Sequence, residues 1–340
     1  MASEHAFELH DACFGGHADA LRVLLDRGVD LESTNEVGFT PLFSACWNGH
    51  ADAALLLLDR GAEVDHADRE AWTPLHGTCQ NGFGEAATLL LDRGADVQRR
   101  THDGATPLFV ACRHGHTELA KLCLDRGADI HRAANSGATP IFVSVQENYI
   151  DTARLLIDRG ADVDMPNNDG ASPLLIVCQE GHANAAKLLL ERGADVESAL
   201  QNNAGPLYMA CQNNHFEAAR HCLDHGAVVD RATTVGTSPL VITCFEGHVS
   251  VAQLCLERGA DINQVTSFGT TLVQAARRGG HDYMAAWLAR IQSGGGWAHH
   301  LSEPRYQLVL LRAAAARGLA RRRRADQAKE QLLDFLFPGD

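Results

Sequence analysis

The fold is decided by the stretch at residues 104–130, which reads GATPLFVACRHGHTELAKLCLDRGADI. Thr106 and Pro107 open a helix, because threonine caps free N–H groups and proline fits the first turn, where its missing donor costs nothing. A Gly-His pair then marks a tight turn. A second helix over about residues 118–126 ends at Gly127, a favourable left-handed cap. The stretch therefore predicts two short helices joined by a turn.

The same pattern recurs every 33 residues without an insertion. Its prolines are Pro41, Pro74, Pro107, Pro140, Pro173, Pro206 and Pro239, and its glycines after the second helix are Gly28, Gly61, Gly94, Gly127, Gly160, Gly193, Gly226 and Gly259. Another glycine stands two residues before most of the Thr-Pro pairs. Asn203 stands in that row and tolerates a left-handed conformation, whereas Ala71 fits it poorly. A register of this kind predicts stacked, repeated helix pairs.

The units resemble ankyrin repeats, whose pattern G-x-T-P-L-H-x-A-x-x-G-H, second helix and G-A-D-V matches almost residue for residue. The resemblance implies an all-α ankyrin-repeat solenoid of helix-turn-helix pairs with β-hairpin fingers, with about nine 33-residue units and a C-terminal helical tail. The family's His after Pro-Leu survives only as His76, so apolar packing replaces an inter-unit hydrogen bond elsewhere. We expect the solenoid at residues 5–290, a flexible Gly-rich linker at 291–296 and a helical extension at 297–340.

Composition limits the partners of the chain. Its formal net charge of −14 disfavours general nucleic-acid binding, which depends on Lys and Arg neutralising phosphates. No apolar run is long enough to span a bilayer, and the first residues lack the features of a secretory signal. We expect a monomeric cytoplasmic protein. The arginine block at residues 321–324 leaves open nuclear import, docking on the acidic solenoid, contact with an anionic partner or a solvated helix end.

The ten cysteines all follow the repeat and predict packing rather than chemistry. Equivalent residues in stacked helices are roughly 8–10 Å apart, beyond the roughly 7 Å Cα limit for a disulfide and too far to share a zinc ion. We therefore predict no metal site and no cofactor. Three pairs eleven residues apart could approach within one helix pair: Cys112/Cys123, Cys211/Cys222 and Cys244/Cys255. The repeated histidines are predicted to bond backbone carbonyls.

The sequence predicts a binding protein rather than an enzyme, because it lacks phosphate-loop, metalloprotease, nucleophile-elbow and kinase motifs. The resemblance implies that contacts come from the finger tips and the inner face of the first helix. Aromatic residues and Arg are common binding anchors. We therefore predict that a protein partner binds at Phe14, Phe39, Trp47, Trp72 and Arg113. Phe245 is included because it lies at the same inner-face position of its repeat as Phe14, Trp47 and Arg113. The alternative is that these aromatic residues pack against their neighbours.

Two further interpretations concern the partner. Gln146, Gln179 and Gln212, with adjacent glutamates, favour a polar or basic ligand segment along the middle units. The main functional hypothesis is a non-enzymatic scaffold for protein interactions. The alternative is a substrate-recognition or regulatory subunit of an enzyme complex, such as a ubiquitin ligase or kinase, with the tail recruiting the enzyme.

Overall fold

A computed structural model describes residues 2–294 and residue 297 of the chain. These residues form eighteen helices and no strand, so the prediction of an all-α fold is confirmed for this part of the chain. The chain divides into two compact units, residues 1–228 (unit 1) and residues 229–340 (unit 2). The boundary between them falls inside the predicted solenoid, and each unit is described separately below.

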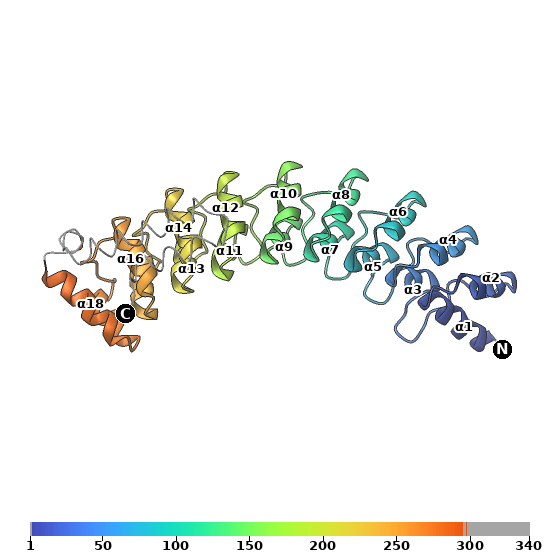
Figure 1. Cartoon of the computed structure of the whole chain (residues 1–340), viewed down its shortest axis with the longest axis horizontal. Helices are drawn as coiled ribbons and strands as arrows, with labels where there is room; N and C mark the ends of the chain where they lie inside the picture. The colour runs from blue at the N-terminus through green and yellow to red at the C-terminus, as the bar shows by residue number, and fades with distance from the viewer. Residues whose placement is uncertain (1, 295–296, 298–340) are drawn as a thin grey trace, which may run out of the picture. The chain divides into compact units, whose positions relative to one another are not determined.

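Unit 1 consists of two rows of helices that alternate along the chain (Figure 1). The inner row contains α1 (Ala2–Phe14), α3 (Pro41–Trp47), α5 (Pro74–Asn81), α7 (Pro107–Arg113), α9 (Pro140–Gln146), α11 (Pro173–Glu180) and α13 (Pro206–Gln212). The outer row contains α2 (Ala18–Asp26), α4 (Ala51–Asp59), α6 (Gly84–Asp92), α8 (Thr117–Asp125), α10 (Ile150–Asp158), α12 (Ala183–Glu191) and α14 (Phe216–Asp224). Each helix packs on the next one in its own row and on its pair in the other row.

The Thr-Pro and Ser-Pro pairs begin the inner helices as predicted. The hydroxyl of Thr40 accepts a hydrogen bond from the backbone N–H of Phe43 at 3.1 Å, and Thr106, Thr139 and Ser172 act in the same way. This satisfies one of the N–H groups that the first turn leaves without a partner. Gly205 offers no such side chain, yet α13 still begins at the following proline.

The Gly-His turn joins neighbouring repeats as well as the two helices of one repeat. The Nε2 atom of His215 donates to the carbonyl of Gln179 in the preceding repeat at 3.0 Å, and the same bond links His50, His116 and His182 to their preceding repeats. A Cβ on Gly181 would lie 2.4 Å from the ring of His215. Glycine suits this position because the next repeat's imidazole lies against it and because its φ is +81°, and Asn148 fills the equivalent position with a φ of +62°.

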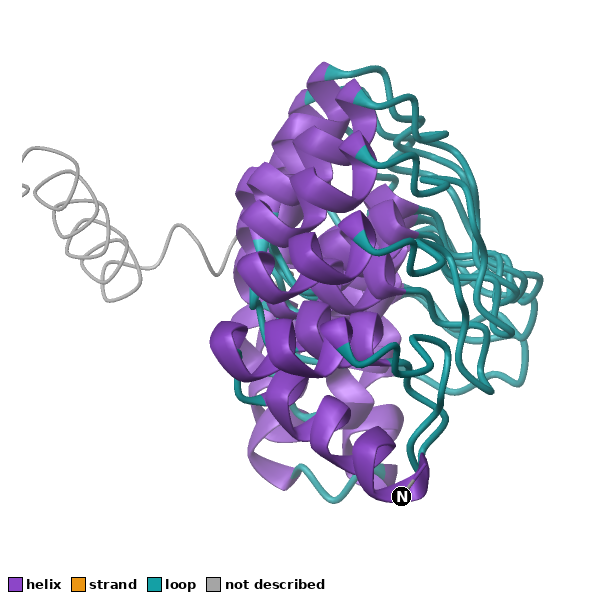
Figure 2. Ribbon diagram, turned by 90° about the vertical axis from the view of Figure 1, so that its right-hand side faces the viewer, coloured by secondary structure: helices purple, strands orange, loops and turns teal. Residues whose placement is uncertain are grey.

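The predicted β-hairpin fingers are not confirmed, since the described residues form only one isolated bridge, Val265 to Thr271. The loops of unit 1 instead contain side-chain-capped turns, and they leave the helices on one side (Figure 2). In one turn, Asp68 Oδ1 accepts from the N–H groups of Glu70 and Trp72 at 2.9 and 2.8 Å. Adjacent loops are joined by single backbone bonds, such as His102 N–H to the carbonyl of Glu70 at 3.0 Å.

Unit 2 contains four described helices: α15 (Pro239–Glu246), α16 (Val249–Glu257), α17 (Leu272–Arg278) and α18 (Asp282–Ser293). Thr271 caps α17 without a following proline, and Gln274 completes a reciprocal cap by accepting from the N–H of Thr271 at 3.0 Å. Residues 291–293, the first part of the predicted linker, lie in α18. The extension beyond residue 297 and its arginine block lie outside the described residues.

Candidate interaction surface

The cysteines lie in the core, as predicted, and two pairs of them contact each other between repeats. All ten are buried thiols. The sulfur atoms of Cys79 and Cys123 are 3.9 Å apart, and those of Cys178 and Cys222 are 3.5 Å apart. These pairs join an inner helix to the outer helix of the next repeat. Burial raises the pKa of the Cys13 thiol to about 12, which leaves little reactive thiolate.

His76 is also a core residue. Its Nδ1 atom accepts from the backbone N–H of Thr73 at 3.2 Å, and its Nε2 atom faces the carbonyl of Ala105 in the next repeat at 3.3 Å. Because the side chain is fully buried, desolvation lowers the pKa of His76 to about 4, and the hydrogen bond to Ala105 opposes this shift only in part. The imidazole is therefore a neutral bridge between repeats at physiological pH.

Three of the predicted binding residues are partly buried among other aromatic groups. The ring of Phe39 stacks on that of Phe43 at 4.2 Å and lies 5.9 Å from that of Trp47. Trp47 also covers Gly77 of the next repeat, where an added Cβ would lie 3.2 Å from the indole. Trp72 lies 5.7 Å from the ring of His76. Phe39, Trp47 and Trp72 therefore combine packing with a partly exposed edge.

The other predicted residues are exposed. Phe14 is 62% exposed at the end of α1, and Arg113 is exposed at the end of α7. Phe245 is 41% exposed in unit 2. Phe14, Phe39 and Trp47 belong to the first two repeats of unit 1, which places three of the predicted residues near its N-terminal end.

A groove at this end was not predicted as a unit. It has a volume of about 690 Å³ and lies between α1 and the loop at residues 34–37. Three exposed apolar residues line it. Phe7 is 74% exposed and Val37 is 58% exposed, and Phe14 is the third. Asp11 and Glu36 supply negative charge, and Nδ1 of His10 is buried without a hydrogen bond. The missed signal was Phe7, which lies seven residues before Phe14 and thus on the same helix face.

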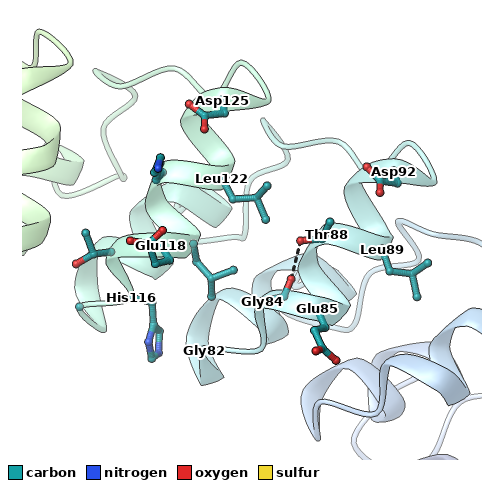
Figure 3. A pocket seen from close by; sticks show the side chains of 14 residues that line it. Gly82, Gly84, Glu85, Thr88, Leu89, Asp92, His116, Glu118, Leu122 and Asp125 are labelled. Atoms are coloured by element: carbon teal, nitrogen blue, oxygen red, sulfur yellow. Dashed lines mark hydrogen bonds between the residues drawn. The ribbon is translucent and has the colours of Figure 1, made fainter.

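A second hollow, of about 1080 Å³, lies between the outer helices α6 and α8 (Figure 3). Gly84 lies in its lining, and a Cβ added there would meet no other atom within 4 Å. Its rim is acidic, with Glu85 and Glu118 at the lower ends of the two helices and Asp92 and Asp125 at their other ends. It lacks the exposed aromatic groups of the N-terminal groove and is a weaker candidate for binding a protein.

Acidic-Arg-Gly triplets end most of the outer helices of unit 1, and they also link the repeats. Five of these arginines pair with the aspartate that ends the preceding outer helix, at 2.7–2.9 Å: Asp26–Arg60, Asp59–Arg93, Asp92–Arg126, Asp125–Arg159 and Asp158–Arg192. The partners are 34 residues apart, one more than the repeat. These side chains are therefore engaged with one another, not offered to a ligand.

Comparison with known families agrees with this architecture. A family model described as ankyrin repeats in three copies matches residues 7–68, 64–134, 131–199 and 195–266. The chain therefore belongs to the ankyrin-repeat family, whose repeats are generally modules for protein–protein interaction. No curated protein matches the chain. Among the described helices, none is both long enough and apolar enough to cross a membrane.

Proposed function

We propose that the protein is a non-enzymatic scaffold of nine ankyrin units, with finger loops, that binds a partner protein on the concave face and finger tips. The observation that carries this proposal is the N-terminal groove, where Phe7, Phe14 and Val37 are each more than half exposed beside a cavity of about 690 Å³. Burying such residues against a partner contributes roughly 25 cal/mol per Å² of apolar surface, before the cost of association. Left in water, they contribute nothing to folding.

The charges of the groove favour a basic partner segment. Asp11 and Glu36 line it, and the whole chain carries a net charge of −14. An apolar side chain flanked by Lys or Arg would complement both properties of the groove. Trp47, Trp72 and Arg113 extend the proposed surface along the following repeats, with the exposed edges of the two indoles available for contact. Phe245 is proposed as a separate contact in unit 2.

We propose that the protein acts as a monomer in the cytoplasm or nucleus and does not bind nucleic acid. The alternative role, recognition of substrates for an enzyme such as a ubiquitin ligase, depends on a tail that lies outside the described residues. The groove supports partner binding in both cases, so the scaffold is the function proposed here.

The test is a crosslinking pulldown from native lysate with full-length protein. The double variant Phe14→Ser/Val37→Ser should lose the partner without loss of folding, because both side chains are largely exposed. Tyr283→Ser is the matched control, since Tyr283 is 78% exposed but lies on α18, outside the inner helices and the finger loops. A partner captured equally by the double variant and the wild type would contradict the N-terminal location. Trp47→Ala/Trp72→Ala then tests the remainder of the surface, with thermal unfolding measured in parallel because both side chains also pack.

A further inference from the structure

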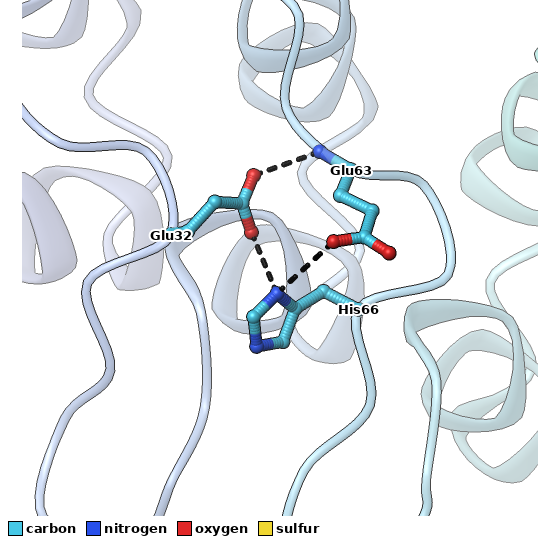
Figure 4. Close-up of side chains that lie close together, drawn as sticks. All are labelled: Glu32, Glu63 and His66. Carbon is cyan, nitrogen blue, oxygen red and sulfur yellow. Dashed lines mark hydrogen bonds and ion pairs between the residues drawn. The ribbon is translucent and has the colours of Figure 1, made fainter.

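Three side chains that can bind metal converge between the first two repeats of unit 1. Glu32 lies in the loop between α2 and α3, and Glu63 and His66 lie in the equivalent loop between α4 and α5. One ligand atom from each, the Nδ1 of His66 and a carboxylate oxygen of each glutamate, lies within 4.8 Å of the other two. Figure 4 shows the two carboxylates on either side of the imidazole. Within the described residues this is the one cluster of three such groups.

The two separations from His66 are close to those between the ligands of a bound zinc ion. The Nδ1 atom of His66 is 2.9 Å from an oxygen of Glu32 and 3.5 Å from an oxygen of Glu63. Ligands bound about 2.0–2.1 Å from zinc in a tetrahedral arrangement are about 3.3 Å from one another. A cation could therefore replace the direct contacts with small movements of the side chains.

The backbone already holds one ligand in place. The other carboxylate oxygen of Glu32 accepts from the backbone N–H of Glu63 at 2.8 Å. This bond orients the remaining oxygen of Glu32 towards His66, as hydrogen bonds to ligand carboxylates commonly do in metal sites. Glu32 and His66 are about one-third exposed and Glu63 is two-thirds exposed, so a hydrated cation can reach the cluster.

The equivalent interface one repeat further on has two carboxylates but no third metal ligand. One repeat further on, the equivalents of Glu32, Glu63 and His66 are Asp65, Asp96 and Arg99. The N–H of Asp96 likewise bonds to the carboxylate of Asp65, at 3.0 Å. There Arg99, which has no atom that can bind a metal, supplies positive charge near the carboxylate of Asp65. The first interface has an imidazole in that place, and its two carboxylates can be balanced by a cation.

We propose that Glu32, Glu63 and His66 form a binding site for a divalent zinc-type cation that links the first two repeats. An imidazole with two carboxylates favours zinc and similar transition metals over Mg²⁺ and Ca²⁺, which take oxygen ligands. Three protein ligands leave a coordination position open to water or to a carboxylate of a partner. The cation stabilises the repeats next to the N-terminal groove by binding only the folded arrangement.

The test is calorimetric titration of full-length protein with Zn²⁺. The wild type should bind one Zn²⁺ ion at this site more tightly than it binds further Zn²⁺ ions elsewhere on the chain. His66→Arg, which reproduces the arrangement at Arg99, should weaken that event at least about tenfold. Glu63→Gln should weaken it as well, and it serves as a second variant that keeps the loop's backbone bond. His102→Gln is the matched control, because His102 faces a single carboxylate, that of Glu70, at 3.8 Å.

A second readout separates metal binding from a structural role. Excess Zn²⁺ should raise the unfolding temperature of the wild type and of His102→Gln but not that of His66→Arg. The chain has 18 histidines, so weak binding elsewhere is expected, and the comparison between variants isolates this site. The proposal is overturned if His66→Arg binds Zn²⁺ as tightly as the wild type, or if Zn²⁺ stabilises both equally. Neither result would affect the proposed function of the N-terminal groove.

Discussion

Ala71 occupies a backbone position that suits glycine. Its φ is +62°, whereas six equivalent positions hold glycines with φ between +71° and +91°. A left-handed conformation costs a residue with a Cβ about 1–2 kcal/mol. Ala71→Gly should therefore stabilise unit 1 by about 1 kcal/mol, with part of the gain lost to the greater freedom of glycine in the unfolded chain. Denaturant unfolding would measure it.

Asn203 provides the matched control for that substitution. It has the same left-handed φ, +63°, but asparagine tolerates this conformation. Asn203→Gly should therefore change the free energy of unfolding less than Ala71→Gly. A destabilisation by Ala71→Gly would show that the Cβ of Ala71 contributes packing that outweighs its strain.

His76 should make stability depend on pH. Its pKa is about 4 in the folded chain and near 6.5 when unfolded, so the unfolded state binds more protons between these values. The stabilisation is fully present above about pH 6.5 and is lost as pH falls towards 4, by up to about 3 kcal/mol. Chemical unfolding measured from pH 7 to pH 4.5 tests this.

The natural comparison for His76 is the residue found at that position in other repeats. Phe43 and Phe109 occupy it in the repeats on either side, so His76→Phe places an apolar side chain in a comparable pocket. The variant should lose part of the pH dependence between 6.5 and 4.5. Parallel curves for the variant and the wild type would mean that other groups cause the acid sensitivity.

At the scale of helices, the sequence predicted what is local and missed what connects repeats. Thr106 and Pro107 predicted the start of α7, and the second helix, expected at about 118–126, spans Thr117–Asp125. The contacts between cysteines 44 residues apart, such as Cys79 and Cys123, were not predicted. Such a contact depends on how far one repeat rotates against the next, which a linear pattern does not specify.

The paired strands expected in the finger loops are not confirmed, for a related reason. The turn residues were visible in the sequence, but the resemblance implied paired strands. Asp68 satisfies the backbone N–H groups of its own turn with its side chain, so the loop needs no hairpin partner. Only single bonds, such as Asn135 N–H to the carbonyl of Asp103 at 2.8 Å, connect adjacent loops.

The Asp–Arg pairs between outer helices also could not be predicted from the sequence, and each contributes little to stability. Exposed ion pairs each contribute only about 0–1 kcal/mol, because water screens them. Asp92 and Arg126 are 58% and 33% exposed, typical of the series. Their value therefore lies in fixing the register of successive outer helices as much as in stability, and a motif at the end of one helix does not reveal its partner in another.

For the whole molecule, periodicity predicted the architecture but not the places where it is broken. The candidate surfaces lie where a unit departs from its neighbours: Phe7 and Phe14 at the atypical first repeat, and His66 where the next repeat has Arg99. The three proposed metal ligands are separated by 31 and 3 residues, unlike any local zinc motif. The stack determines their proximity, so only the folded chain could identify them.

The architecture of unit 1 also predicts how it opens. The main contacts of its helices are with their pair and with the adjacent repeats, so stability should be transmitted by nearest neighbours. Leu24 in α2 and Leu156 in α10 are buried at equivalent repeat positions, one at the end of the stack and one in its middle. Truncating a buried leucine to alanine costs about 2–5 kcal/mol. The position of the truncation should therefore decide which segments open.

Hydrogen exchange on the two variants would measure this. Leu24→Ala should accelerate exchange in α1 and α2 and leave the repeats beyond α4 protected, because those repeats retain both neighbours. Leu156→Ala should accelerate exchange in α9 and α10 and then in the repeats on both sides, since each loses one stabilising interface. Equal acceleration throughout unit 1 in both variants would show instead that the unit unfolds as one cooperative block, in which the end repeat is as tightly coupled as the middle one.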